Sequence, residues 1–245
     1  GTLVQAVVTQ GLTKKYKSCT AVDGLDLTIE QGETFALLGV NGAGKTTVIK
    51  MLSCLSRPTG GDALLNGKSV LSQAAEIKKF IGVSPQETAI APNLTVKENL
   101  ELLCGIYGFP RQKRRLRIEG LCSGLKLEEA LDKRAGKLSG GYQRRLSIAL
   151  ALISEPEILF LDEPTLGLDV LVRSDLWDII RSLRGRSTII LTTHYLEEAE
   201  ALSERIGIMK EGRLLALGTA HSLKARTGAA SFEQAFINIV KGEIK

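Results

Sequence analysis

The sequence predicts an α/β fold in which a mostly parallel sheet carries a phosphate-binding loop. An apolar run at residues 34–38 precedes a glycine-rich loop at 39–46, and residues 47–52 have helical character. A strand, a glycine loop and a helix in this order form the framework of a phosphate site. Two further apolar runs, at 158–162 and 188–194, are typical of strands that are buried on both faces. The three runs therefore predict parallel strands of one sheet.

The glycine-rich loop matches the pattern G-x-x-x-x-G-K-[ST], which is typical of nucleoside triphosphate binding. Its glycines let backbone N–H groups turn toward the phosphates without a Cβ clash. Lys45 is expected to contact the β- and γ-phosphates, and the Thr46 hydroxyl is expected to ligate Mg²⁺. The alternative is a chance match to the pattern. The flanking strand and helix argue against it, and the dipole at the N-terminus of the helix favours an anion. The residues predicted to bind nucleotide are Gly39, Asn41, Gly42, Ala43, Gly44, Lys45, Thr46 and Thr47.

Two carboxylates follow the strand at residues 158–162. Asp162 ends this run and Glu163 comes next, and open α/β sheets place their ligands at the carboxyl ends of the strands. Asp162 is therefore predicted to hold Mg²⁺, while Glu163 is predicted to orient or deprotonate an attacking water. The alternative is an ordinary polar turn at Asp162-Glu163-Pro164, and the phosphate loop upstream argues against it.

A histidine ends the run at residues 188–194. His194 is predicted to contact the γ-phosphate and to hold the catalytic geometry, which makes it the third predicted catalytic residue beside Lys45 and Glu163. A lone histidine at the end of a strand is otherwise most often a satisfied structural residue. The chain's other histidine, His221, has no partner motif, and we expect it on the surface.

Taken in this order, the motifs closely resemble those of the ATP-binding cassette (ABC) family, and in particular the nucleotide-binding domain of an ABC transporter. The resemblance extends over about residues 3–218. It implies that Tyr16 stacks on adenine and that Gln86 reaches Mg²⁺ and senses a transmembrane partner. It also implies a signature motif that serves the nucleotide of a second subunit, and an aspartate at the dimer interface: Ser139, Gly140, Gly141 and Asp169.

Two positions depart from the family's usual pattern. Tyr142 replaces the glutamine of Leu-Ser-Gly-Gly-Gln, and the glutamine is displaced to Gln143, so no contact with the nucleotide sugar is assigned to it. The Ser-Gly-Gly core is intact, and γ-phosphate recognition is expected to be retained. Residues 166–168 read Leu-Gly-Leu instead of Ser-Ala-Leu, so that Gly167 adds backbone freedom there. Both variants resemble exporters of drugs, lipids and polysaccharides.

The signature motif also has a physical basis in the sequence. Ser139 is a good helix N-cap, and residues 142–152 continue as an apolar helix. The N-terminus of that helix would present backbone N–H groups to an anion. The alternative is a glycine-rich turn before an ordinary helix. By resemblance, the anion belongs to ATP on another subunit, so that two chains enclose two nucleotides head to tail as a homodimer or a heterodimer.

The pattern of elements predicts an ATPase domain at residues 1–218 and a helical extension at 219–245. We expect a P-loop NTPase core with a mostly parallel sheet, an N-terminal antiparallel β subdomain and an inserted α-helical subdomain. The capping box Thr95–Glu98 opens the first helix of that insertion. The expected boundaries are 1–33 for the β region, 34–86 and 156–218 for the core, and 88–150 for the helical subdomain.

Individual elements follow from shorter patterns. Strands are expected at residues 3–8 and 21–29, and a hairpin at 206–217 with its turn at 210–213. A terminal helix is expected at 231–240. Packing of this helix against its own domain is favoured over a role in partner binding.

Composition excludes several other classes of protein. The longest apolar run, residues 148–153, is far below the ~20 residues of a membrane span, and no signal peptide is apparent. Because residue 1 is Gly, we expect a trimmed N-terminus. The four cysteines lack metal-ligand spacing and indicate reduced thiols in the cytoplasm. A basic run at 111–117 could face anionic lipids, although a solvated face is the simpler interpretation. Aromatic residues are not interleaved in this run, so nucleic-acid binding is not expected.

The sequence therefore predicts a Mg²⁺-dependent ATPase that drives transport, with ATP and Mg²⁺ as cofactors. We expect a cytoplasmic subunit held at the inner face of the membrane by separate transmembrane permease subunits, with export as the expected direction. A soluble ABC ATPase without transport is an alternative, but the chain has one cassette and no long coiled coil. A small-molecule kinase would leave the signature motif unexplained.

Overall fold

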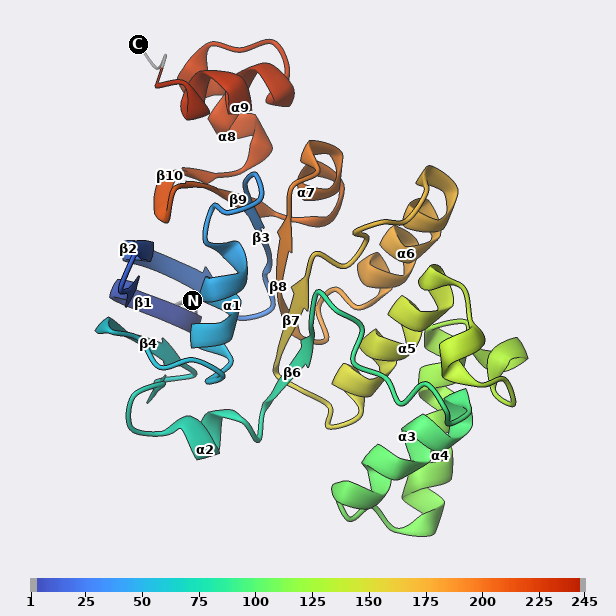
Figure 1. Ribbon diagram of the computed structural model, residues 1–245. Coiled ribbons are helices and arrows are strands. Elements are labelled where there is room, and N and C mark those ends of the chain that lie inside the picture. Colours follow the sequence, from blue (N-terminus) through green and yellow to red (C-terminus); the bar gives the residue numbers. More distant parts are fainter. Residues whose placement is uncertain (1–3, 243–245) are drawn as a thin grey trace.

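The computed structural model describes residues 4–242, which fold into two sheets flanked by helices (Figure 1). Six strands form the larger sheet, in the order β10-β9-β3-β8-β7-β6. All neighbouring pairs are parallel except β9 and β10, which form the predicted hairpin. The bounds of these strands are β3 Thr34–Leu38, β6 Ile81–Ser84, β7 Ile158–Asp162, β8 Thr188–Thr193, β9 Arg205–Lys210 and β10 Arg213–Gly218.

The larger sheet separates two hydrophobic cores. Along β7, Ile158 and Phe160 point into one core while Leu159 and Leu161 point into the other, and all four are at most 1% exposed. This alternation confirms that the apolar run at 158–162 is a strand covered on both faces. The carboxyl ends of β3, β6, β7 and β8 consequently meet at one edge of the sheet, where the site residues follow them.

The smaller sheet is antiparallel and larger than the sequence predicts. Its order is β2-β1-β4-β5, with bounds β1 Gln5–Tyr16, β2 Cys19–Glu30, β4 Gly60–Leu65 and β5 Lys68–Ser69. The expected strands at 3–8 and 21–29 were too short, and Leu3 lies outside the described residues. Residues 9–16 are polar and their register shifts repeatedly, so no regular alternation marks them as a strand.

Strands β4 and β5 join this sheet although the sequence grouped them with the core at 34–86. β4 pairs with β1, and its buried residues Ala63 and Leu65 contribute to the core that the smaller sheet shares with α1. Helix α1 (Lys45–Leu52) lies between the two sheets (Figure 1). Helix α1 packs against both sheets. Because the phosphate loop leads directly into α1, both sheets support its position.

Most helices lie on the face of the larger sheet that is opposite to α1 (Figure 1). Thr95 and Glu98 form the predicted capping box at the start of α3. Helix α5 begins two residues earlier than expected, and α8 lies within the segment expected as a helical extension, although no separate helix was predicted there. The bounds are α2 Ala74–Ile77, α3 Val96–Ile106, α4 Arg111–Gly124, α5 Gly140–Leu152, α6 Val170–Ser182, α7 Leu196–Leu202, α8 Ala220–Thr227 and α9 Phe232–Val240, with 3₁₀ turns at Glu128–Ala130 and Ala135–Lys137.

The last helix, α9, packs on its own domain, as expected. Phe232, Ala235 and Ile239 are buried, and the helix contacts α7, α8 and β10. His221 is exposed, as predicted. Among residues 4–242, none of the helices combines the length and the apolar character that a membrane crossing requires.

All four cysteines are free thiols. Cys104 and Cys122 are buried in the helical region, and burial raises the pKa of both thiols, that of Cys122 to about 11. A raised thiol pKa lowers the thiolate fraction at neutral pH, so these two side chains behave as core residues.

Candidate nucleotide and magnesium site

The phosphate loop is held between the start of β2 and the end of β9. Gly42 and Gly44 have φ values of +85° and +103°, which L side chains rarely adopt. A Cβ on Gly44 would lie 2.5 Å from the carbonyl oxygen of Ala21, and one on Gly39 would lie 2.5 Å from that of Met209. Close backbone packing therefore requires glycine at positions 39 and 44. Helix α1 begins directly after Gly44.

Lys45 is buried at the centre of the predicted site and is 5% exposed. Its Nζ donates to the carbonyl oxygens of Gly39 and Thr193, the latter at 3.1 Å, and forms an ion pair of 2.9 Å with Glu163 Oε1. A buried ammonium requires such partners, because an unpaired charge in the protein interior is costly. The predicted loop lysine and the predicted base are therefore in direct contact.

Glu163 connects Lys45 to His194. Its Oε2 lies 2.9 Å from His194 Nδ1, and its backbone N–H donates to the Thr192 hydroxyl at 2.9 Å. Glu163 also has a φ of +48°, in the left-handed region that is uncommon for residues other than glycine. Such strained backbone is maintained at functional sites by the surrounding contacts. The three predicted catalytic side chains thus form one continuous chain of contacts.

Three oxygen ligands converge beside this cluster. Thr46 Oγ1 lies 3.3 Å from Asp162 Oδ1 and 3.5 Å from Gln86 Oε1. Asp162 Oδ1 also accepts from the hydroxyl of Thr192. A hydroxyl, an amide oxygen and a carboxylate are hard donors of the kind that Mg²⁺ prefers. The residues predicted to hold the metal therefore fit a magnesium ion that would also be bound by phosphates.

Tyr16 lies at the tip of the β1–β2 hairpin, which flanks the phosphate loop through Ala21. The side chain is 50% exposed, and Lys14 Nζ lies 5.5 Å from the centroid of its ring. Asn41 in the loop is also exposed. Both side chains are open to a ligand, but no contact of the described residues tests the predicted stacking on adenine.

The predicted signature motif and interface aspartate lie together in a second cluster. Ser139 Oγ accepts from the backbone N–H of Tyr142 at 3.4 Å, and Asp169 Oδ1 accepts from that of Val172 at 3.0 Å, so both cap helices as predicted for Ser139. A Cβ on Gly141 would lie 2.5 Å from Val172 Cγ1. The starts of α5 and α6 therefore pack closely, while Ser139 and Asp169 face solvent.

The displaced glutamine of the signature is used within its own chain. Gln143 Nε2 donates to the carbonyl oxygen of Ala135 at 3.1 Å, and the Arg145 guanidinium lies 4.9 Å from the centroid of the Tyr142 ring. Gln143 therefore supports the turn before α5.

Several residues that sequence reasoning missed hold the site in place. Thr192 and Thr193 bond to Asp162, Glu163 and Lys45. Glu198 is fully buried and accepts from the Thr165 hydroxyl and from Trp177 Nε1, the latter at 2.7 Å. Burial raises the pKa of Glu198, and these hydrogen bonds oppose that rise. The available signal was a charged residue, Glu198, on the apolar face of a short helix.

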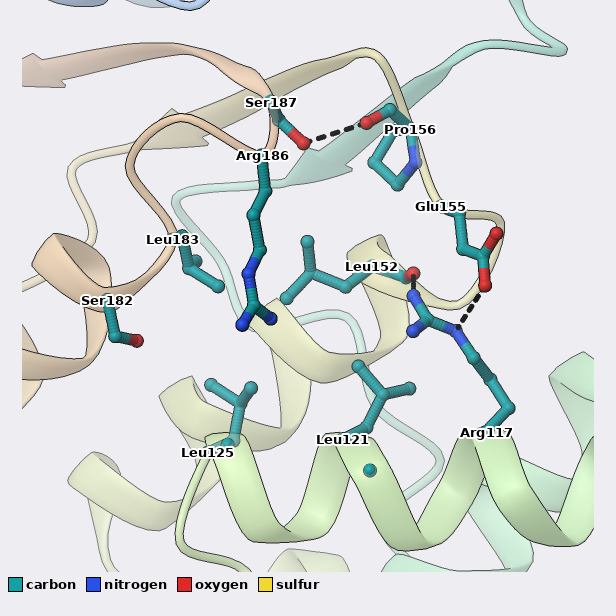
Figure 2. Close-up of a pocket in the computed structure, with 12 residues that line it drawn as sticks. Arg117, Leu121, Leu125, Leu152, Glu155, Pro156, Ser182, Leu183, Arg186 and Ser187 are labelled. Carbon is teal, nitrogen blue, oxygen red and sulfur yellow. Dashed lines mark hydrogen bonds and ion pairs between the residues drawn. The ribbon is translucent and has the colours of Figure 1, made fainter.

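A separate cavity of about 460 Å³ lies at the C-terminal end of α5 (Figure 2). Leu121, Leu125, Leu152 and Leu183 form its apolar wall, and Arg186 points into it. None of the residues predicted to bind nucleotide lines this cavity. It is therefore distinct from the candidate site at the phosphate loop.

Comparison with known proteins agrees with this geometry. Residues 22–166 match the ABC transporter family. The chain is 44% identical over 239 residues to ABC transporter A family member 11 of Arabidopsis thaliana, covering 91% of this chain and 25% of the relative. It is 42% identical to the daunorubicin/doxorubicin resistance ATP-binding protein DrrA of Streptomyces peucetius, covering 92% and 68%. The Nod factor export ATP-binding protein I of Burkholderia orbicola is also 42% identical, with 87% and 71% covered.

Solved structures extend the comparison. A dimeric ATP-binding cassette in a post-hydrolysis state, bound to ADP and Pi, aligns with a TM-score of 0.78 and 28% identity, covering 87% of this chain and 98% of that one. The chain spans about a quarter of the length of its plant relatives and about 70% of the bacterial ones. With its phosphate loop, paired carboxylates and signature helix in place, the chain belongs to the ABC transporter family.

Proposed function

We propose that this chain is the Mg²⁺-dependent ATPase subunit of an ABC transporter and that it drives export. The observation that carries the proposal is the direct contact among Lys45, Glu163 and His194, beside the oxygen ligands of Thr46, Gln86 and Asp162. This is the arrangement required to bind a nucleoside triphosphate, hold its metal and activate water. The bacterial relatives named for drug resistance and Nod factor export support the direction.

The ion pair between Lys45 and Glu163 supports an order of events. The γ-phosphate of ATP competes with the Glu163 carboxylate for the Lys45 ammonium, because both are anionic acceptors. Nucleotide binding thereby releases Glu163 to accept a proton from water, while His194 keeps hold of its second oxygen. Mg²⁺, when bound, supplies positive charge to the phosphate oxygens. Lys45 then stabilises the negative charge that develops on the transferred phosphoryl group.

The second half of the proposal concerns the partner of this chain. Ser139 and Asp169 face solvent, and the apolar side chains of Val170 and Leu171 beside them are 68% and 79% exposed. We place the nucleotide of a second ABC domain against this surface, so that closure of the pair follows ATP binding. The dimeric cassette bound to ADP and Pi supports this arrangement. The surface near Gln86 would transmit closure to membrane-bound permease subunits, which hold the chain at the membrane.

Phosphate release tests the proposed activity. The purified chain is incubated with ATP in Mg²⁺ buffer or in excess EDTA, with no acceptor substrate, and inorganic phosphate is measured. We expect release that EDTA abolishes and that Glu163→Gln lowers to background. ADP formation that requires an added hydroxyl acceptor and releases no inorganic phosphate would instead identify a kinase. Release that persists unchanged in EDTA would contradict the assigned role of Thr46, Gln86 and Asp162.

A further inference from the structure

Helix α5 bonds directly to the backbone that carries Gln86. Arg144, one turn into α5, donates from Nη1 to the carbonyl oxygen of Pro85 and from Nη2 to that of Gln86, both at 2.8 Å. One turn further, Ser147 Oγ lies 2.9 Å from Ser84 Oγ. Residues three apart share one face of a helix. One face of α5 therefore follows the end of β6 and the segment after it.

Arg144 is an unusual residue for this position, because its side chain is only 6% exposed. Burial lowers the pKa of its guanidinium, and the negative charges of Asp162, Glu163 and Glu198 oppose that effect. A buried cation is tolerated when its donors are satisfied and opposite charges are near. The planar guanidinium also binds both carbonyls at once, which fixes the direction of the Gln86 backbone relative to α5.

The other end of α5 is attached to α4. Arg117 of α4 donates to the carbonyl oxygens of Leu152 and Ile153, the latter at 3.3 Å, and lies 3.8 Å from Glu155 (Figure 2). Leu121 of α4 and Leu146 of α5 belong to one hydrophobic core. Helices α4 and α5 are thus joined at several points, and a displacement of this helical layer acts on Gln86 through Arg144.

We propose that Arg144 is a positioning residue that couples the signature motif at the start of α5 to Gln86. The signature would face the nucleotide of a second subunit, whereas Gln86 contacts the metal site of its own chain, so this coupling rests on the function proposed above. Occupancy of one nucleotide site is then transmitted to the other through a helix and two hydrogen bonds. The coupling requires the two donors of Arg144 and no contact between Arg144 and ATP.

Double-mutant cycles test the coupling. ATP turnover is measured for Ser139→Ala, Gln86→Ala and the double variant, first in the parent and then in Arg144→Met, which keeps the length and the apolar stem of the side chain. In the parent we expect the double variant to lose about fivefold less turnover than the product of the single losses, because coupled sites are not additive. In Arg144→Met we expect the turnover of the double variant to lie within twofold of the value that the product of the single losses predicts.

Two matched variants exclude a purely structural effect. Arg145→Met removes the neighbouring arginine, which bonds to the carbonyl oxygen of Lys126 at 3.5 Å and lies over the Tyr142 ring. This variant should leave the fivefold deviation unchanged. Arg144→Lys keeps a charged donor and should restore part of it. An unchanged deviation in Arg144→Met, or additive losses in the parent, would overturn the coupling while leaving the ATPase proposal intact. A parent without Mg²⁺-dependent turnover would overturn both.

Discussion

The two halves of the proposed ATP site differ in how completely the chain satisfies their polar groups. At the phosphate loop, Lys45 and Glu163 are buried and bond to each other and to the surrounding backbone. At the signature end, Ser139 and Asp169 are exposed. Within residues 4–242, each of these side chains accepts a hydrogen bond only from the first turn of its own helix. One half is organised within the chain, whereas the other presents its groups outward.

This difference indicates which steps a single chain performs. On the proposed function, the organised half binds the triphosphate with groups of its own chain, so nucleotide binding should not depend on a partner. The outward half offers helix N-termini, whose N–H groups and dipole favour an anion supplied by another subunit. Hydrolysis should therefore depend on both halves, while binding depends on one. The following substitutions separate the two.

Glu163→Gln is expected to have the largest effect. The amide keeps the shape of the side chain but cannot accept the proton of water, and loss of a general base typically lowers turnover by about 10²–10⁴-fold. ATP binding should change by no more than about threefold, because the amide still contacts Lys45 through its oxygen. Single-turnover hydrolysis and equilibrium binding of a fluorescent ATP analogue measure the two quantities. Equal turnover in the variant and the parent would remove Glu163 from its role.

Lys45→Ala should affect the organised half at the binding step. A charge-assisted hydrogen bond contributes about 1.5–3 kcal/mol, which corresponds to a loss of roughly 10–150-fold in ATP affinity. Lys50→Ala is the matched control, since Lys50 is an exposed lysine on the same helix. Isothermal titration with ATP should show the loss in the first variant alone. Similar affinities in both variants would place the triphosphate elsewhere.

Ser139→Ala should affect the outward half and leave ATP binding by the monomer unchanged. Loss of the cap costs about 1 kcal/mol of stability, and loss of the hydroxyl at the partner's phosphate should lower turnover by about tenfold. Ser231→Ala is the control, because Ser231 caps α9 by accepting from Gln234 N–H at 3.1 Å. Urea unfolding should show equal losses of stability in the two variants. A tenfold loss of turnover in both would reduce the role of Ser139 to capping.

The smallest effect concerns Glu198, the buried carboxyl that joins α7 to the loop after Glu163. Because its folded pKa is raised by burial, the protonated form contributes stability below the ordinary pKa of glutamate, and this contribution is lost as pH rises through the folded pKa. Charged groups that face it are Glu163 and Arg144. Glu198→Gln should therefore gain stability relative to the parent as pH rises from about 4 to 8.

Urea unfolding at the two ends of that range measures this difference. The same comparison for Glu197→Gln, an exposed neighbour in α7, provides the control and should show no such trend. A stability difference for Glu198→Gln that is independent of pH would contradict the raised pKa, because it would require Glu198 to bind its proton equally well in the folded and the unfolded chain.

The sequence predicted β3, β7 and β8 of the larger sheet well, because each is a largely apolar run that ends at a motif. It did not predict β6, whose four residues include a glycine and a serine. It predicted the antiparallel sheet poorly. Residues 9–16 contain Leu12 as their one fully buried hydrophobic side chain, and register shifts interrupt the period of two on which strand prediction depends. Helix α8 was not distinguished within the expected extension at 219–245, because only Leu223 of its residues is buried, which leaves no apolar stripe.

The candidate site was predictable to the extent that its residues belong to local motifs. The phosphate loop, the carboxylates Asp162 and Glu163, and His194 all follow the ends of recognisable strands. The structure brings these groups together. Thr192, Arg144 and Glu198 were not predictable in the same way. Each acts through partners about 20 to 60 residues distant in sequence, and only the packing of strands and helices brings such pairs into contact.

The solution mass of Glu163→Gln, measured by light scattering after gel filtration with and without Mg·ATP, tests the central claim most directly. The account predicts a monomer without nucleotide and a dimer with it, because the outward half of each chain is completed only by the nucleotide of the other. Ser139→Ala in the same background should weaken that dimer. A chain that binds Mg·ATP and remains monomeric at every concentration would contradict closure of two copies around ATP.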